Sequence, residues 1–223
     1  MGAAMEGFKK KLSPSTTMRF TFTRPERQDL AKSWLLVSLA FAVFMTGLGF
    51  SAGFLSIFLF ALAVAAVTVG LGFLAHELSH KYVANGYGCY AEYRADNTML
   101  FLSLLLSPFH VFIAAPGAVH ISGHPDHVQS GRISLAGPAA NIALALLFLL
   151  LYLVLPLGPI RSAMGFGAII NSSLALFNLL PFGIFDGAKV IAWDKAAYGL
   201  AIAVAVILTF CSFFFVQAQL GLL

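Results

Sequence analysis

The run His76-Glu77-Leu78-Ser79-His80 constrains this chain most, because it lies at the carboxyl end of a long apolar segment. Residues 56–75 carry no charged side chain, and about 20 such residues can cross the hydrocarbon core of a bilayer as a helix. On a helix, positions i and i+4 share one face, so His76 and His80 can bind one zinc ion together. Glu77, next to His76, is a candidate general base. The pattern predicts a hydrolytic metal site in or near a membrane.

The composition also indicates a membrane protein. The chain has 223 residues, of which 60% are hydrophobic and 10% are charged, and its mean hydropathy is +0.90. A soluble domain is about 45–50% apolar and about 25% charged. We therefore expect an all-α integral membrane protein with about five to six transmembrane helices, a re-entrant segment and a short N-terminal strand. The net charge of +4 does not indicate nucleic-acid binding, because the basic residues follow a topological pattern.

Apolar runs separated by Gly, Pro and polar residues set the expected spans. Residues 18–23 alternate between apolar and polar side chains, which predicts a short strand. Thr23 is then the expected N-cap of the first helix, with Pro25 in its first turn and Glu26 completing a capping box. The predicted spans are residues 25–50, 54–84, 134–157, 164–182 and 198–216, and residues 85–97 are expected to form a polar loop.

The segment 99–119 is apolar but interrupted by Pro108, His110, Pro116 and Gly117. A re-entrant loop or hairpin is favoured there over a sixth span, because irregular backbone at membrane depth needs cover from protein or a water-filled cavity. His120, His124 and His127 follow within a Gly- and Pro-containing stretch. Their loose spacing favours exposed loop histidines over a second metal site.

The basic residues predict an orientation. With the N-terminus in the cytoplasm and five alternating spans, Arg161 is the one outside residue among the 13 Lys and Arg. This strong positive-inside pattern predicts a multi-pass protein of the cell membrane with its active site toward the cytoplasmic side. The expected parts are a cytoplasmic tail with the short strand (1–33), an intramembrane core (34–190) and a C-terminal transmembrane helix (191–223).

A catalytic zinc site needs a third protein ligand, and Asp186 is the best candidate. It lies in an apolar stretch at the inner end of the fourth span, where a lone carboxylate is costly unless it is paired or bound to a metal. The second and fourth spans run in the same direction, so Asp186 is expected on the same membrane side as the two histidines. Gly187 lets the backbone turn there.

Three motifs together resemble the site-2 protease family of intramembrane zinc metalloproteases. They are His76-Glu77-x-x-His80, Gly137-Pro138-Ala139-Ala140-Asn141 and Asn178-x-x-Pro181-x-x-x-x-Asp186-Gly187, and the resemblance covers residues 34–190. It implies one Zn²⁺ bound by His76, His80 and Asp186, with Glu77 as the catalytic base. It also implies that Asn178 and Asn141 steady the polarised carbonyl or the hydrogen-bond network of the site. For both asparagines, plain hydrogen bonding between helices is the alternative.

These expectations predict an intramembrane zinc endopeptidase that cleaves transmembrane protein substrates within the lipid bilayer. A spanning substrate helix must unwind to expose its carbonyls, and either segment 99–119 or segment 18–23 could hold it by edge pairing. A metal-binding membrane transporter and a catalytically inactive relative are alternatives. A transporter needs polar ligands at several depths, but the first and fifth spans lack His, Asp and Glu in their apolar stretches. The intact Glu77 argues against an inactive relative.

Overall fold

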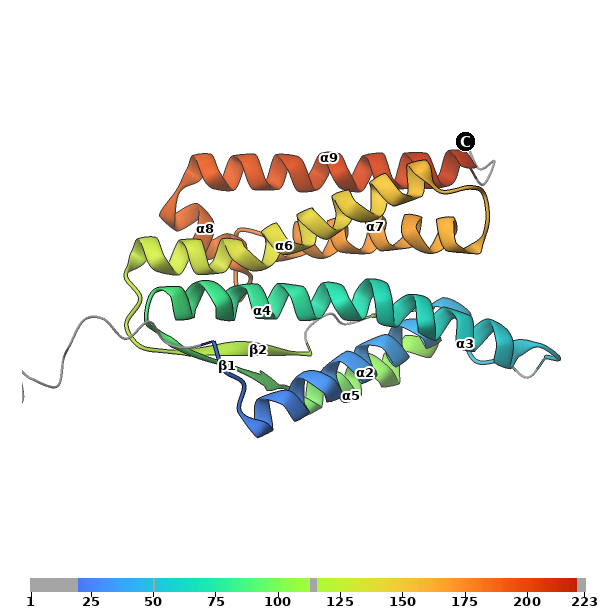
Figure 1. Ribbon diagram of the computed structural model, residues 1–223, viewed down its shortest axis with the longest axis horizontal. Coiled ribbons are helices and arrows are strands. Elements are labelled where there is room, and N and C mark those ends of the chain that lie inside the picture. The colour runs from blue at the N-terminus through green and yellow to red at the C-terminus, as the bar shows by residue number, and fades with distance from the viewer. Residues whose placement is uncertain (1–19, 50, 113–115, 220–223) are drawn as a thin grey trace, which may run out of the picture.

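The computed structural model describes residues 20–49, 51–112 and 116–219. This part contains five helical segments long and apolar enough to cross a membrane, which confirms the predicted all-α membrane fold (Figure 1). The chain is therefore a multi-pass membrane protein. The five segments are α2 (Arg24–Thr46), Phe54–Gly86, α6 (His127–Val154), α7 (Pro159–Asn178) and α9 (Lys195–Gln219).

The second segment is not one regular helix. It consists of α3 (Phe54–Ala65), a π-helical turn η1 (Ala66–Gly70) and α4 (Leu71–Gly86). In Figure 1, α4 lies in the middle of the molecule, with α6 to α9 on one side and α2, α5 and the sheet on the other. The helix that carries the motif is thus packed on two sides by protein.

A two-stranded antiparallel sheet covers the carboxyl half of α4 (Figure 1). It pairs β1 (Tyr90–Ala95) with β2 (Gly117–Ser122), and Tyr93 lies opposite Val119. The prediction of a polar loop over 85–97 is therefore wrong for its second half. Local sequence did not reveal the strand, because its partner lies more than 20 residues further along the chain.

Within the segment between the two strands, the described residues form no helix long enough to span the membrane. They form the short helix α5 (Asn97–Leu106) and the 3-10 turn η2 (Ser107–Phe109), and the chain then returns to β2. The described residues contain no sixth span, in agreement with the favoured re-entrant reading of 99–119.

The N-terminal prediction needs correction. Residues 20–23 belong to no strand, while Met18 and Arg19 lie outside the described residues. Thr23 does cap α2, since its Oγ accepts a hydrogen bond from the Glu26 amide at 3.2 Å. The Glu26 carboxylate, however, accepts from the Lys81 ammonium at 2.6 Å instead of completing a capping box. A buried ammonium is a stronger partner for a carboxylate than a backbone amide.

Two other boundaries differ from expectation. Helix α6 begins at His127 rather than near Ser134, because Asp126 and Gln129 form a capping box. Helix α7 ends at Asn178, and a turn leads into α8 (Asp186–Trp193) before α9 starts. In Figure 1, α8, the sheet and the end of α4 lie at the same end of the molecule.

Candidate metal centre

Three of the residues singled out in the sequence converge between α4 and the first residue of α8. Asp186 Oδ2 lies 3.3 Å from His76 Nε2 and 3.2 Å from His80 Nε2, and one ligand atom from each residue falls within 4.8 Å of the others. Ligands about 2.0–2.1 Å from a tetrahedral zinc ion are about 3.3–3.4 Å apart. The distances from the carboxylate to the two imidazoles therefore match those expected around a zinc ion.

Helix α6 orients both imidazoles from behind. His76 Nδ1 lies 2.6 Å from Asn141 Oδ1, and His80 Nδ1 lies 2.7 Å from the Ile133 carbonyl oxygen. An Nδ1–H held by an oxygen leaves the Nε2 lone pair for a metal, the usual arrangement around metal-binding histidines. Because both acceptors come from one helix, the tilt of α6 sets the angle between the two ligands.

Gly137 allows α6 to approach this closely. A Cβ at this position would lie 2.6 Å from both His76 Nε2 and His80 Cε1, inside the van der Waals contact distance. The next residue, Pro138, lies within the helix and lacks the N–H that would bond to the carbonyl four residues earlier. The Gly-Pro pair thus opens space for the imidazoles and loosens the helix beside them.

Asp186 is held at the start of α8 by a tight backbone contact. A Cβ on Gly187 would lie 2.6 Å from the Leu180 carbonyl oxygen, so only glycine lets this turn close. Burial raises the pKa of the Asp186 carboxyl, but its close contacts with the imidazoles of His76 and His80 outweigh this and hold the pKa well below its usual range. The group is therefore an anionic ligand at neutral pH.

Glu77 faces a cavity of about 420 Å³ that the three metal-binding candidates also line. Its side chain is buried, and Oε2 accepts a hydrogen bond from the Val119 amide at 3.1 Å. The outer edge of β2 therefore reaches the candidate base directly. This contact was not expected from the sequence, because it joins residues far apart in the chain.

The two predicted asparagines occupy different places. Asn178 lines the cavity and donates one amide hydrogen to the Leu174 carbonyl at 3.0 Å, which leaves its second N–H available. Asn141 has no exposed surface, and its amide nitrogen donates to Gly72 O and Asn171 Oδ1, both at 3.1 Å. Asn141 thus holds His76 from behind, in a network that links α4, α6 and α7.

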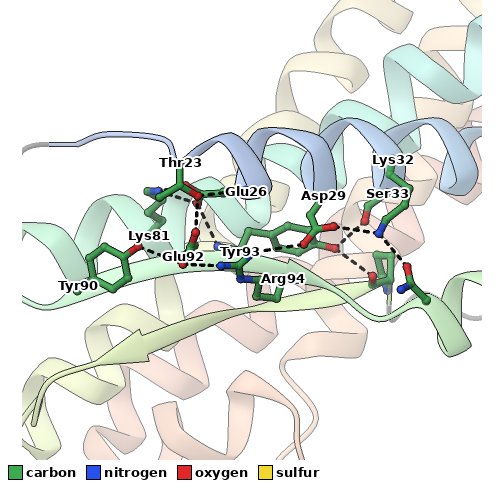
Figure 2. A network of polar contacts seen from close by, with 12 residues as sticks. Thr23, Glu26, Asp29, Lys32, Ser33, Lys81, Tyr90, Glu92, Tyr93 and Arg94 are labelled. Carbon is green, nitrogen blue, oxygen red and sulfur yellow. Dashed lines mark hydrogen bonds and ion pairs between the residues drawn. The ribbon is translucent and has the colours of Figure 1, made fainter.

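A buried ion pair anchors the other side of α4. Figure 2 shows Glu26 of α2 between Lys81, the residue after His80, and the β1 residue Tyr93. Its Oε1 accepts from Lys81 Nζ at 2.6 Å and from the Tyr93 amide at 3.0 Å. Glu26 is 0% exposed and Lys81 is 2% exposed. One carboxylate therefore ties α2, the motif helix and the sheet together.

The other histidines take no part in this site. His120, His124 and His127 are all exposed, and His76, His80 and Asp186 form the one group in the described ranges with metal-binding geometry. The favoured interpretation of the His-rich stretch as exposed histidines agrees with this arrangement.

The chain is 40% identical over 186 residues to a protein of Methanocaldococcus jannaschii that is named as a putative zinc metalloprotease. The aligned region covers 81% of this chain and 91% of that protein. The chain belongs to this zinc metalloprotease family. No family model matches this membrane metalloprotease, and no solved structure matches it. Zinc, the metal in the family name, suits the two imidazoles and one carboxylate that meet in the structure.

Proposed function

We propose that this membrane metalloprotease is an intramembrane zinc endopeptidase of the site-2 protease type, which hydrolyses peptide bonds in or near transmembrane segments of its substrates. The observation that carries the proposal is the position of Glu77 beside His76, His80 and Asp186, in a cavity among membrane-spanning helices. The positive-inside pattern supports a cytoplasmic N-terminus, an active site toward the cytoplasm and a place in the cell membrane.

The residues of the site have distinct roles in this proposal. His76, His80 and Asp186 would hold one zinc ion, which supplies Lewis-acid polarisation of a carbonyl and acidifies a water molecule. Glu77 takes the proton of that water and returns it to the leaving amine. The free N–H of Asn178 is available to the oxygen on which negative charge develops, a contact typically worth a few kcal/mol.

The outer edge of β2 is a suitable place for an unwound substrate. The Tyr93 amide donates to Glu26 rather than to β2, whereas the Asp96 amide donates across the sheet to Pro116 O at 2.9 Å. Tyr93 and Val119 are therefore a non-hydrogen-bonded pair, so the backbone groups of Val119 point away from β1. Because this direction alternates along a strand, the backbone groups of Gly117 and Ile121 also point away from β1. Gly117, Val119 and Ile121 all line the cavity.

This edge overlaps the end of one of the two expected docking segments, 99–119, and extends it to Ile121. A substrate strand that pairs with Gly117 and Ile121 would present its carbonyls beside Glu77, since the amide between them bonds to that carboxylate. The competing segment 18–23 belongs to no strand over its described residues. Substrate recognition would thus depend on backbone hydrogen bonds and on a helix that unwinds easily.

The test pairs zinc content with cleavage of a model spanning-helix substrate by purified protein in detergent. Glu77→Gln should keep its zinc and lose cleavage, because it removes the base but no ligand. Asp186→Ala should lose both zinc and cleavage. If all three proteins bind zinc alike and none cleaves any helix offered, a metal-binding or transport function would replace this one. If wild type binds zinc at these residues without cleaving, it is a catalytically inactive relative.

A further inference from the structure

A line of buried amide groups connects His76 to the π-helical turn η1. Asn141 of α6 and Asn171 of α7 are both 0% exposed. His76 Nδ1 lies 2.6 Å from Asn141 Oδ1, and Asn141 Nδ2 lies 3.1 Å from Asn171 Oδ1. Asn171 Nδ2 in turn lies 3.3 Å from Thr68 O in η1 and 2.9 Å from Gly167 O. Four polar groups thus follow one another from the π-helical turn to the metal centre.

Three backbone carbonyls determine the direction of every bond in this line. A carbonyl oxygen can only accept, so the NH₂ of Asn171 must face Thr68 O and Gly167 O. Its Oδ1 then faces Asn141 and needs a donor. The NH₂ of Asn141 supplies it, and also donates to Gly72 O at 3.1 Å. Asn141 Oδ1 is left facing His76, whose Nδ1 must carry the hydrogen.

We infer that Asn171 is a positioning residue of the metal centre, which acts through Asn141 to hold His76 in the tautomer with a free Nε2 lone pair. Asn171 makes no hydrogen bond to His76 itself, so its effect passes through the Asn141 amide. The inference rests on the proposed metal site and adds a residue outside the three motifs. Without Asn171, only the Gly72 carbonyl would still fix the orientation of the Asn141 amide. Turning this amide over would then cost one hydrogen bond fewer, and it would offer the NH₂ to His76 and favour the wrong tautomer.

The packing around Asn171 supports a dedicated place for this side chain. A Cβ on Gly72 would lie 3.1 Å from Asn171 Cγ, so glycine in α4 makes room for the amide. The turn η1 is also held from the opposite side, because Trp34 Nε1 of α2 donates to Ala66 O at 3.1 Å. Side chains that reach into the backbone ladder are typical of irregular helical turns, and π-helical turns are common at functional sites.

The size of the effect follows from the distance to the metal. Replacing a residue that bonds directly to a metal-binding histidine usually weakens metal affinity about 10–100-fold. We expect this for Asn141→Leu, and about three- to tenfold for Asn171→Leu, which acts one residue further away. The two effects should not multiply, because residues in one network are coupled. The double variant should therefore bind zinc about as weakly as Asn141→Leu alone.

The chain offers a matched control in the next residue. Ser172 is also on α7 and 0% exposed, but its Oγ donates to Ile169 O at 3.0 Å within its own helix. Ser172→Ala removes a buried polar group without touching the amide line. It should leave zinc affinity unchanged, although it can lower stability.

The experiment measures the zinc dissociation constant of the purified full chain in detergent by competition with a chromophoric chelator. We expect Asn171→Leu to lower the zinc affinity and Ser172→Ala to leave it unchanged. Adding Asn171→Leu to Asn141→Leu should lower the affinity no further. The inference is overturned if Asn171→Leu behaves like Ser172→Ala, or if the two asparagine effects multiply. Should Asn171→Leu not fold, Gly72→Ala displaces the same amide from the opposite side, and an unchanged affinity in that variant would equally refute the inference.

Failure of the proposed metal site gives a different pattern. If His76→Ala and Asp186→Ala bind zinc as tightly as wild type, the site itself is wrong. If these two lose zinc while Asn171→Leu keeps wild-type affinity, the metal site stands and only the role of Asn171 falls.

Discussion

Replacing Lys81 by methionine should destabilise the protein strongly, because it leaves the Glu26 carboxylate buried without its counter-charge. Glu26 is 0% exposed, so water cannot replace the lost ammonium. Of the partners described above, only the Tyr93 amide, at 3.0 Å, would remain. Lys81 Nζ also lies 4.6 Å from the centre of the Phe22 ring, an additional cation–π contact that the variant loses.

The magnitude follows from how buried ion pairs respond to the loss of one partner. Removing one charge of a buried pair typically costs about 3–5 kcal/mol, while replacing both by well-packed hydrophobic residues of similar volume is often neutral. We therefore expect Lys81→Met to cost about 3–5 kcal/mol. The double variant Glu26→Gln/Lys81→Met should return to within about 1–2 kcal/mol of wild type, since the Gln carbonyl still accepts from the Tyr93 amide.

The assay is equilibrium unfolding in mixed detergent micelles, followed by the fluorescence of Trp34 and Trp193. Lys32→Met is the matched control, because Lys32 pairs with Asp29 at 2.9 Å but its side chain is 38% exposed. Losing this exposed ion pair should lower the free energy of unfolding by about 0–1 kcal/mol. The reasoning is refuted if Lys81→Met costs no more than the control, or if the double variant is as unstable as Lys81→Met.

Three further outcomes test the site and its surroundings. Gly137→Ala should abolish zinc binding in a chelator competition, because the added Cβ would overlap both imidazoles. Gly86→Ala is the control and should bind zinc normally, because the space around its added Cβ is open. Ile121→Pro removes an outward N–H from the edge of β2 and should lower kcat/KM with zinc content unchanged. Ile121→Val keeps this N–H and should cleave like wild type. If the two variants cleave at the same rate, a substrate strand does not pair with this edge. A hydrogen bond from the Thr23 hydroxyl lowers the pKa of Glu92 below its ordinary value of 4.5, so this stabilisation is present above pH 4.5 and lost as the pH falls through the lower folded value. The unfolding midpoints of wild type and Glu92→Gln should therefore converge as the pH is lowered below 4.5, and a constant gap would contradict this.

The candidate ligands could be proposed from the sequence because their signals are local. The spacing of His76 and His80 places them on one helix face, and Asp186 is conspicuous as an acid in an apolar stretch. Asn171 was visible only as a polar residue within the fourth span. Its role depends on Thr68, 103 residues away in the sequence, and no spacing rule connects the two.

The strands show the same limit. The alternation over 18–23 predicted a strand that the described residues do not contain, while β1 was taken for a loop. A strand needs a partner, and the partner of β1 is separated from it by the whole of α5 and η2. Glu26 was likewise assigned to a capping box from its neighbours, although its carboxylate bonds to Lys81, 55 positions further along.

The sequence by itself determined that this chain crosses the membrane several times and carries a zinc-binding motif at the end of one span, since hydropathy and helical spacing are properties of neighbouring residues. Only the tertiary structure decided which groups orient the imidazoles, which backbone edge faces Glu77, and how Lys81 is neutralised. Those contacts join α2, α4, α6, α7 and the sheet. They form only when the packing of helices removes polar groups from water and obliges each of them to find a partner.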